Sequence, residues 1–283
     1  MTLIMAKKIT DSVTKKDKIK KSFVQYIKYQ KGYKKSLMIL GCQRSGTTLI
    51  SHLFNQLDYC RVFGEFSILS NKGVDKIRLN ALEEVVGIFE NSHAPLIVFK
   101  PLVESQNAKQ LLNTIPKSNV LWVYRNYKDV AASDVKKFSK TAGRGNILPI
   151  INNDHSNWRG EHVSEEARSV IKSMYSDKLS PQDCACLFWY ARNVLFYEQA
   201  LESNERVYIW PYEDFIGSPQ TMFSQLMASL DLPKPKNEIF QDIYNDSVNS
   251  SSDLEISKDI NDLCANLLER LNSTSLEKNG SLE

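Results

Sequence analysis

The chain has 283 residues, of which 42% are hydrophobic and 24% are charged, the composition of an ordinary globular protein with one large or two small domains. No stretch approaches the ~20 apolar residues of a membrane-spanning helix, and the N-terminal apolar run is too short for a signal peptide, so we expect a cytoplasmic protein without a transmembrane segment. The five cysteines are scattered without a C-x-x-C pair, which argues against a disulfide framework and a zinc site.

The charge is distributed unevenly along the chain. Residues 1–35 hold eleven lysines and two aspartates, a net charge of +9, whereas the rest of the chain carries a net charge of −6. This segment is predicted to be a basic N-terminal arm, either solvated or attracted to an acidic polymer or a membrane surface. Within it, large apolar residues at helical spacing predict an amphipathic helix over residues 17–31 that packs on the domain. These apolar residues are Ile19, Phe23, Tyr26 and Ile27.

From residue 36 onward, short apolar runs alternate with amphipathic stretches. The runs predict buried strands at residues 36–40, 60–63, 95–99, 119–124 and 206–210. The amphipathic stretches predict helices at residues 46–57, 75–90, 104–114, 126–138, 164–175, 180–203, 218–230 and 254–271. The alternation predicts an α/β fold, a doubly wound parallel sheet of about five strands flanked by helices. The loop after the first strand, described below, makes the predicted sheet P-loop-type.

The predicted strands and helices form a single domain over residues 36–271. Gly, Pro, Asn and Asp crowd into residues 139–163, which we predict to be a long loop within a lid or acceptor region at 139–180. The polar tail at residues 272–283 is predicted to be disordered.

The first predicted strand runs into a loop with two glycines. Gly41 and Gly46 stand five apart, as in a phosphate-binding loop, and glycine permits the positive φ values of a tight turn. A helix that starts near Gly46 aims its free N–H groups at an anion held there. A nucleotide triphosphatase has a lysine after the second glycine, whereas this chain has Thr47 and Thr48 there and Arg44 inside the loop. We therefore expect a ligand with a shorter 5′ chain than ATP, such as a phosphosulfate.

A second group of polar residues follows the predicted fourth strand. Arg125 stands at the end of the strand, where its planar guanidinium can bind an anion near the start of the next helix. Ser133 lies about two turns along that helix, at 3.6 residues per turn. Lys137 is four residues further and shares the face of Ser133.

These motifs resemble those of the sulfotransferases that use 3′-phosphoadenosine 5′-phosphosulfate (PAPS). G-x-x-R-S-G-T-T resembles their 5′-phosphosulfate loop, and the arginine followed eight residues later by serine resembles their 3′-phosphate-binding segment. The segment from Tyr212 to Phe215, Y-E-D-F, resembles a stretch that is mainly structural in the family. The resemblance covers roughly residues 36–232, with the lid poorly matched. The motif layout is closest to the glycan and tyrosylprotein branches, which carry Gly-Glu after the first helix.

The resemblance implies in-line transfer of the sulfuryl group of PAPS to an acceptor hydroxyl or amine. It makes Glu65 the general base and Lys100, after the third strand, the group that stabilises the phosphate leaving group. Arg44 would neutralise the phosphosulfate and assist catalysis. The residues expected to bind the donor are Arg44, Ser45, Gly46, Thr47, Thr48, Arg125, Ser133 and Lys137. We expect no metal requirement.

The sequence leaves the acceptor open: a glycan, a peptide, a lipid or a small metabolite all fit, whereas a nucleic-acid partner is not expected. Trp158, Arg159 and Glu161 in the lid are candidate acceptor contacts, and the oligomeric state is not encoded in any motif. Two other readings remain. One is a P-loop kinase, although this sequence lacks the loop lysine and a clear magnesium-binding aspartate of such kinases. The other is a non-catalytic nucleotide-binding relative.

Overall fold

A computed structural model describes residues 15–72, 76–138, 141–241, 243 and 254–280. Its centre is a five-stranded parallel sheet with the strand order β2-β5-β1-β6-β7. The strands are β1 (Lys35–Gly41), β2 (Cys60–Phe63), β5 (Leu96–Phe99), β6 (Ser118–Tyr124) and β7 (Val207–Pro211). The predicted α/β fold with a P-loop-type parallel sheet is confirmed.

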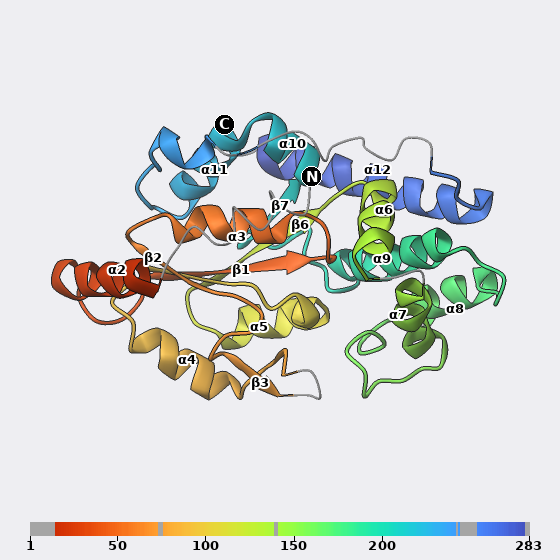
Figure 1. Ribbon diagram of the computed structural model, residues 1–283, viewed down its shortest axis with the longest axis horizontal. Helices are drawn as coiled ribbons and strands as arrows, with labels where there is room; N and C mark the ends of the chain where they lie inside the picture. The colour runs from red at the N-terminus through yellow and green to blue at the C-terminus, as the bar shows by residue number, and fades with distance from the viewer. Residues whose placement is uncertain (1–14, 73–75, 139–140, 242, 244–253, 281–283) are drawn as a thin grey trace.

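Helices cover both faces of this sheet (Figure 1). The α-helices are α2 (Lys15–Lys28), α3 (Thr47–Asn55), α4 (Leu82–Glu90), α5 (Ala108–Thr114), α6 (Tyr127–Phe138), α7 (Ala142–Ile151), α8 (Glu165–Met174), α9 (Pro181–Glu198), α10 (Tyr212–Gly217), α11 (Pro219–Ser229) and α12 (Lys258–Gly280). Two 3₁₀ helices, η1 (Leu102–Asn107) and η2 (Asn237–Phe240), and a small antiparallel pair, β3 (Ser70–Lys72) and β4 (Arg78–Leu79), complete the fold.

The two faces of the sheet bury separate cores, because successive side chains of a strand point to opposite sides. In β1, Leu37 and Ile39 join a core with α3 and α11, whereas Met38 and Leu40 join a larger core with α4, α5 and α9. All four side chains are fully buried. This explains why the strand reads as a continuous apolar run rather than an alternating one.

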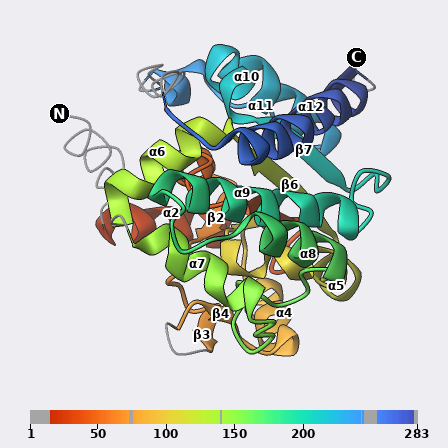
Figure 2. The same cartoon turned by 90° about the vertical axis from the view of Figure 1, so that its right-hand side faces the viewer.

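Parallel pairing brings the chemistry-bearing loops to one edge. Because the strands of the sheet point the same way, the loops after β1, β2, β5 and β6 all leave at the carboxyl end, where open α/β sheets hold their ligands. In Figure 1 the arrowhead of β1 points to this end, and Figure 2 faces it, with α6, α7 and α9 in view.

The prediction of a disordered tail is wrong for residues 272–280, which continue α12. β7 is an edge strand, and an uncovered edge leaves carbonyl groups without partners. The side chains of Ser275 and Asn279 donate to the Ile209 carbonyl at 3.3 and 3.4 Å. The polar side chains of this segment, whose composition predicts disorder, therefore cover the edge of the sheet.

The prediction of a long loop over residues 139–163 is wrong for residues 142–151, which form α7. Gly143 lets this helix approach α9 closely: a Cβ there would lie 2.9 Å from the Pro181 carbonyl oxygen. Ile147 and Ile150 are the buried apolar side chains of this helix. The predicted helix at 75–90 begins only at Leu82, after the short strand β4. Residues 73–75 and 139–140 lie outside the described residues.

The amphipathic helix predicted in the basic arm is present as α2, but its predicted packing is reversed. The apolar residues expected to face the domain are exposed, Phe23 and Ile27 at 63% and 68%. Gln25 is buried instead, at 4% exposure. Residues 1–14 lie outside the described residues. Among the helices that the structure describes, none is both long enough and apolar enough to cross a membrane.

Candidate active site

The loop between β1 and α3 is a tight turn that depends on its glycines. Gly41 and Gly46 have φ values of 130° and 85°, and Arg44 between them has a φ of 68°, which is uncommon for a residue with a Cβ. A Cβ on Gly41 would lie 2.1 Å from the Val123 carbonyl oxygen, and one on Gly46 would lie 2.2 Å from the Tyr212 ring. The loop geometry therefore requires glycine at both positions.

The start of α3 is built to receive an anion. Gly46 is the N-cap and provides no side-chain hydrogen bond, so no side chain caps the first-turn N–H groups of the helix. The Ser45 side chain is fully buried, and its hydroxyl has no hydrogen-bond partner within the described residues. Thr47 is buried and Thr48 is exposed at the helix start. Backbone donors and hydroxyl groups together fit a phosphate or sulfate group.

The structure joins the two predicted motifs through Arg44. Its Nε and Nη2 atoms both donate to Ser133 Oγ on α6, at 3.0 and 2.9 Å. Partial burial of this guanidinium lowers its pKa, yet an arginine keeps its charge in proteins. The neighbouring Gln43 donates to Asp134 Oδ1 at 3.1 Å, which ties the loop to α6 a second time. Segments 89 residues apart therefore meet at one point.

Arg125 is buried at the end of β6. Its Nη2 atom lies 3.4 Å from Asp129 Oδ2, and its guanidinium carbon lies 4.8 Å from the centre of the Tyr212 ring. The carbonyl oxygen of Arg125 accepts a hydrogen bond from Trp189 Nε1 at 2.9 Å. These contacts fix the backbone and the side chain of Arg125 at the same sheet edge as the glycine loop.

Tyr212 has no predicted chemical role, but the structure places it between the two motifs. One part of its ring fills the space that a Cβ on Gly46 would need, and its face lies against Arg125. The next residue, Glu213, accepts a hydrogen bond from the backbone N–H of Asn126 at 3.0 Å. The signal available in the sequence was an aromatic and an acidic residue directly after a strand.

A second cluster forms beside the glycine loop. Lys100 Nζ donates to Thr48 Oγ1 at 3.0 Å and lies 3.3 Å from Glu65 Oε1. The lysine side chain is mostly buried, whereas about a third of the glutamate side chain is exposed, at 10% and 29%. The predicted base and the predicted leaving-group stabiliser are therefore adjacent, with the base on the solvent side.

The other predicted residues are less closely associated with this site. Lys137 is exposed one turn beyond Ser133, and its ammonium lies 5.5 Å from the Phe138 ring. In the lid region, Glu161 pairs with Arg78 at 2.8 Å and accepts a hydrogen bond from Gln106 at 2.7 Å. This candidate acceptor contact ties the lid region to β4 and η1 instead.

The other two acceptor candidates also make internal contacts. Trp158 packs edge-on against Phe188, with ring centres 6.1 Å apart. The Arg159 guanidinium lies 4.4 Å from the Trp158 ring, and its Nε donates to Asn146 at 2.6 Å. The three lid residues therefore make internal contacts, and we do not propose that they bind the acceptor.

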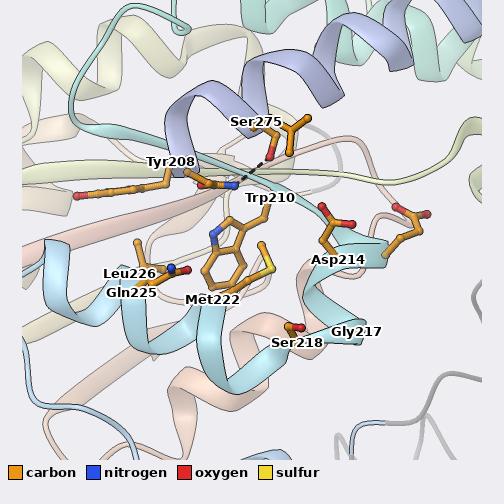
Figure 3. Close-up of a pocket in the computed structure, with 12 residues that line it drawn as sticks. Tyr208, Trp210, Asp214, Gly217, Ser218, Met222, Gln225, Leu226 and Ser275 are labelled. Carbon is orange, nitrogen blue, oxygen red and sulfur yellow. Dashed lines mark hydrogen bonds between the residues drawn. The ribbon is translucent and has the colours of Figure 1, made fainter. Parts of the chain in front are cut away.

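A separate cavity of about 430 Å³ lies beside β7, between α10, α11 and α12 (Figure 3). Trp210, Met222 and Leu226 form its apolar side. None of the residues predicted to bind the donor lines it. Glu213 does, and its other contact is the Asn126 backbone. The cavity is therefore separate from the predicted donor residues, and Glu213 connects it to the segment after β6.

Glu213 gives this region a pH-dependent stability. Burial raises the pKa of its carboxyl group in the folded protein, so folding stability from this group is fully present below its unfolded pKa of ~4.3 and is lost as the pH rises through the folded value. Glu213→Gln removes that loss and keeps an acceptor for Asn126. We expect the stability of the variant relative to wild type, measured by urea unfolding, to increase with rising pH. A difference that shrinks as the pH rises would contradict this account.

No metal site accompanies this arrangement in the part of the chain that is described: no three His, Cys, Asp or Glu residues there are grouped to hold an ion. Cys42, inside the glycine loop, is buried, and burial raises the pKa of its thiol. A thiol with a raised pKa is a poor nucleophile, so the loop cysteine is a packing residue.

Comparison with known proteins decides the family. The model of the sulfotransferase domain family matches residues 34–262, which is most of the chain. The match includes the glycine loop and the segment that begins at Arg125. The chain belongs to the sulfotransferase family. The family that the two motifs resemble is thereby confirmed.

Solved sulfotransferase structures resemble this domain only distantly. The sulfotransferase domain of the Synechococcus PCC 7002 olefin synthase is 12% identical, with a TM-score of 0.49 over 84% of this chain and 96% of that one. A sulfotransferase from Alicyclobacillus acidocaldarius is 13% identical, with a TM-score of 0.49 over 86% and 94%. The sulfotransferase domain from the curacin biosynthetic pathway is 16% identical, with a TM-score of 0.47 over 90% and 98%.

A match to a curated protein is shorter. Over 113 residues the chain is 28% identical to vacuolar protein sorting-associated protein 26C of Dictyostelium discoideum. The match covers 38% of this chain and spans 36% of the length of that relative. It covers too little of either protein to assign this chain to a second family.

Proposed function

We propose that this sulfotransferase moves the sulfuryl group of PAPS to an acceptor hydroxyl or amine. The observation that carries the proposal is the contact of Arg44 with Ser133, because it unites the predicted 5′-phosphosulfate loop with the predicted 3′-phosphate segment. A ligand with an anionic group at each end of a nucleoside matches two adjoining anion sites. PAPS has this chemistry.

The proposed donor site uses both segments. The N–H groups at the start of α3 and the hydroxyls of Thr47 and Thr48 hold the 5′-phosphosulfate, with Arg44 compensating its charge. Arg125 and Ser133 hold the 3′-phosphate, and Lys137, exposed on the same helix, adds positive charge at its margin. When the donor binds, the Arg44 guanidinium would donate to phosphate oxygens, either in place of Ser133 Oγ or in addition to it.

The proposed transfer is an in-line displacement at sulfur. The acceptor oxygen forms a bond to sulfur as the bond between sulfur and the bridging phosphate oxygen breaks, and Glu65 takes the acceptor proton. Lys100 lies 3.3 Å from this carboxylate and 3.0 Å from Thr48, where it can stabilise the negative charge that develops on the leaving phosphate. The protein thus supplies positioning and charge stabilisation, as in phosphoryl transfer.

The role of Ser133 is tested by two ligands that differ only in one phosphate. Ser133→Ala is expected to weaken binding of 3′-phosphoadenosine 5′-phosphate about 10- to 150-fold, the value of a hydrogen bond to a charged group, while AMP binding changes little. Isothermal titration calorimetry measures both. Equal losses for the two ligands would mean that Ser133 acts on the loop through Arg44 rather than on the 3′-phosphate.

No contact among the described residues identifies the class of acceptor. Glycans, peptides and small metabolites are therefore the compounds to screen as acceptors. A metal-free reaction, a cytoplasmic location and the lack of a nucleic-acid partner remain predictions. Acceptor-dependent release of 3′-phosphoadenosine 5′-phosphate from PAPS would support the proposal. Phosphorylated product from ATP and magnesium, with none from PAPS, would favour a kinase. Donor binding without turnover on any acceptor would favour a non-catalytic relative.

A further inference from the structure

The helix α2 is attached to the domain by its polar side. Gln25 Nε2 donates to the carbonyl oxygens of Asp58 and Cys60 at 2.7 and 3.1 Å, and Lys21 Nζ donates to the Asn55 carbonyl at 2.7 Å. These acceptors lie at the end of α3 and the start of β2. A surface helix of a globular protein normally buries its apolar stripe, so this attachment is inverted.

The apolar stripe of α2 faces solvent. Its four members recur at intervals of four, three and one residues, which places them within a sector about 100° wide, roughly 150° from Gln25 on a helix of 3.6 residues per turn. The exposures of Ile19, Phe23, Tyr26 and Ile27 are 63%, 63%, 66% and 68%. With Val24, this helix holds five of the ten large hydrophobic residues exposed in the described chain. Apolar surface is therefore concentrated here rather than scattered.

Positive charge accompanies this stripe. Residues 15–35 contain nine lysines and one aspartate, and Lys20 and Lys28 are exposed on the helix itself. The chain after residue 35 is net negative, so attraction to an anionic surface would come from this arm. A basic helix with a separate apolar face has the properties of helices that lie in the interface of an anionic bilayer.

We propose that α2 binds the protein to the surface of a membrane that contains anionic lipids. The apolar stripe enters the boundary between head groups and acyl chains, and the lysines contact lipid phosphates and carboxylates. The helix lies on the membrane and does not span it, in keeping with its 14 residues. The lysines beside the stripe make an anionic lipid surface the occupant with matching charge.

The position of α2 leaves the sulfotransferase site accessible. The helix contacts the amino-terminal end of β2, whereas the glycine loop and Arg125 lie at the carboxyl end of the sheet (Figure 1). A membrane bound through α2 would therefore face the end of the sheet opposite the donor site. The inference does not depend on the donor or on the acceptor, and it is tested without an activity assay.

The test is flotation of the full chain with vesicles of phosphatidylcholine and phosphatidylserine in a roughly 7:3 ratio, beside pure phosphatidylcholine vesicles. Binding is expected only to the anionic vesicles and is expected to fall at ~1 M salt, where charges are screened over ~3 Å. Phe23→Ser with Ile27→Ser should weaken binding about 100-fold or more, because two large apolar side chains no longer enter the lipid. Lys20→Gln with Lys28→Gln should weaken it about 30-fold.

Matched controls replace exposed residues of the same kind on other helices. Leu148→Ser with Leu276→Ser, and Lys109→Gln with Lys172→Gln, are expected to leave vesicle binding unchanged. Equal binding to neutral and anionic vesicles, or equal losses in the control variants, would overturn the proposal. So would a dimer in sedimentation that Phe23→Ser with Ile27→Ser makes monomeric, with no vesicle binding by the wild type, because the stripe would then be an interface between two copies.

Discussion

Glu65→Gln is expected to lower kcat for sulfuryl transfer about 10²- to 10⁴-fold, the usual contribution of a positioned general base. Glutamine keeps the size of the side chain but cannot take the acceptor proton. The carboxylate lies beside Lys100 at 3.3 Å, outside the glycine loop and Arg125, so donor affinity should be retained. Turnover is measured as the release of 3′-phosphoadenosine 5′-phosphate, with an acceptor identified by screening.

Two comparisons isolate the effect of Glu65. Glu84→Gln removes an exposed carboxylate on α4 and should leave kcat unchanged. Calorimetry with 3′-phosphoadenosine 5′-phosphate reports whether the donor site of Glu65→Gln is intact. Full turnover in Glu65→Gln would remove this residue from the mechanism, whereas loss of donor binding together with turnover would make it a structural residue of the loop.

Gly41→Ala is expected to lower the free energy of unfolding by roughly 2–6 kcal/mol, the sum of positive-φ strain and overpacking. Gly41 has a φ of 130°, and a Cβ would lie 2.1 Å from the backbone oxygen of Val123 in the neighbouring strand. That oxygen belongs to the centre of the sheet and cannot move aside easily. Urea unfolding of the two proteins, with two-state fits, measures the difference.

The control for this prediction is a glycine with the opposite expectation. Gly87 lies inside α4 with open space where a Cβ would be, so Gly87→Ala should stabilise the protein by about 0.5–1 kcal/mol. If Gly41→Ala were as stable as wild type, the loop would have to adopt another conformation, and its role as a preformed anion site would be wrong.

The parts of the fold that depend on local pattern were predictable from the sequence. β1 and β6 contain continuous apolar runs at residues 37–40 and 120–123 because both faces of the sheet are covered, and such runs are recognised without knowing what covers them. The glycine loop was predictable for a similar reason, because the backbone geometry of the turn restricts Gly41 and Gly46. The meeting of Arg44 with Ser133 followed from the parallel sheet, which brings both strand ends to one edge.

What was missed depends on tertiary contacts. The α7 segment is rich in residues that favour loops, and its helix is stabilised by packing on α9. The end of α12 is polar because it binds the carbonyl of an edge strand. The orientation of α2 does not follow from its apolar spacing, which is typical of a buried face, because Gln25 makes the buried contacts instead. The position of Tyr212 between the two motifs is likewise a property of chain packing.

The donor site is tested most directly by thermal unfolding with 3′-phosphoadenosine 5′-phosphate. At ~100 times its dissociation constant the ligand should add about 2.7 kcal/mol to the stability of the wild type, or about 5–10 °C in Tm. Arg125→Ala, compared with its own ligand-free Tm, should show less than half this shift. No shift with this ligand, and an upward shift with ATP and magnesium, would contradict the account and favour a P-loop kinase.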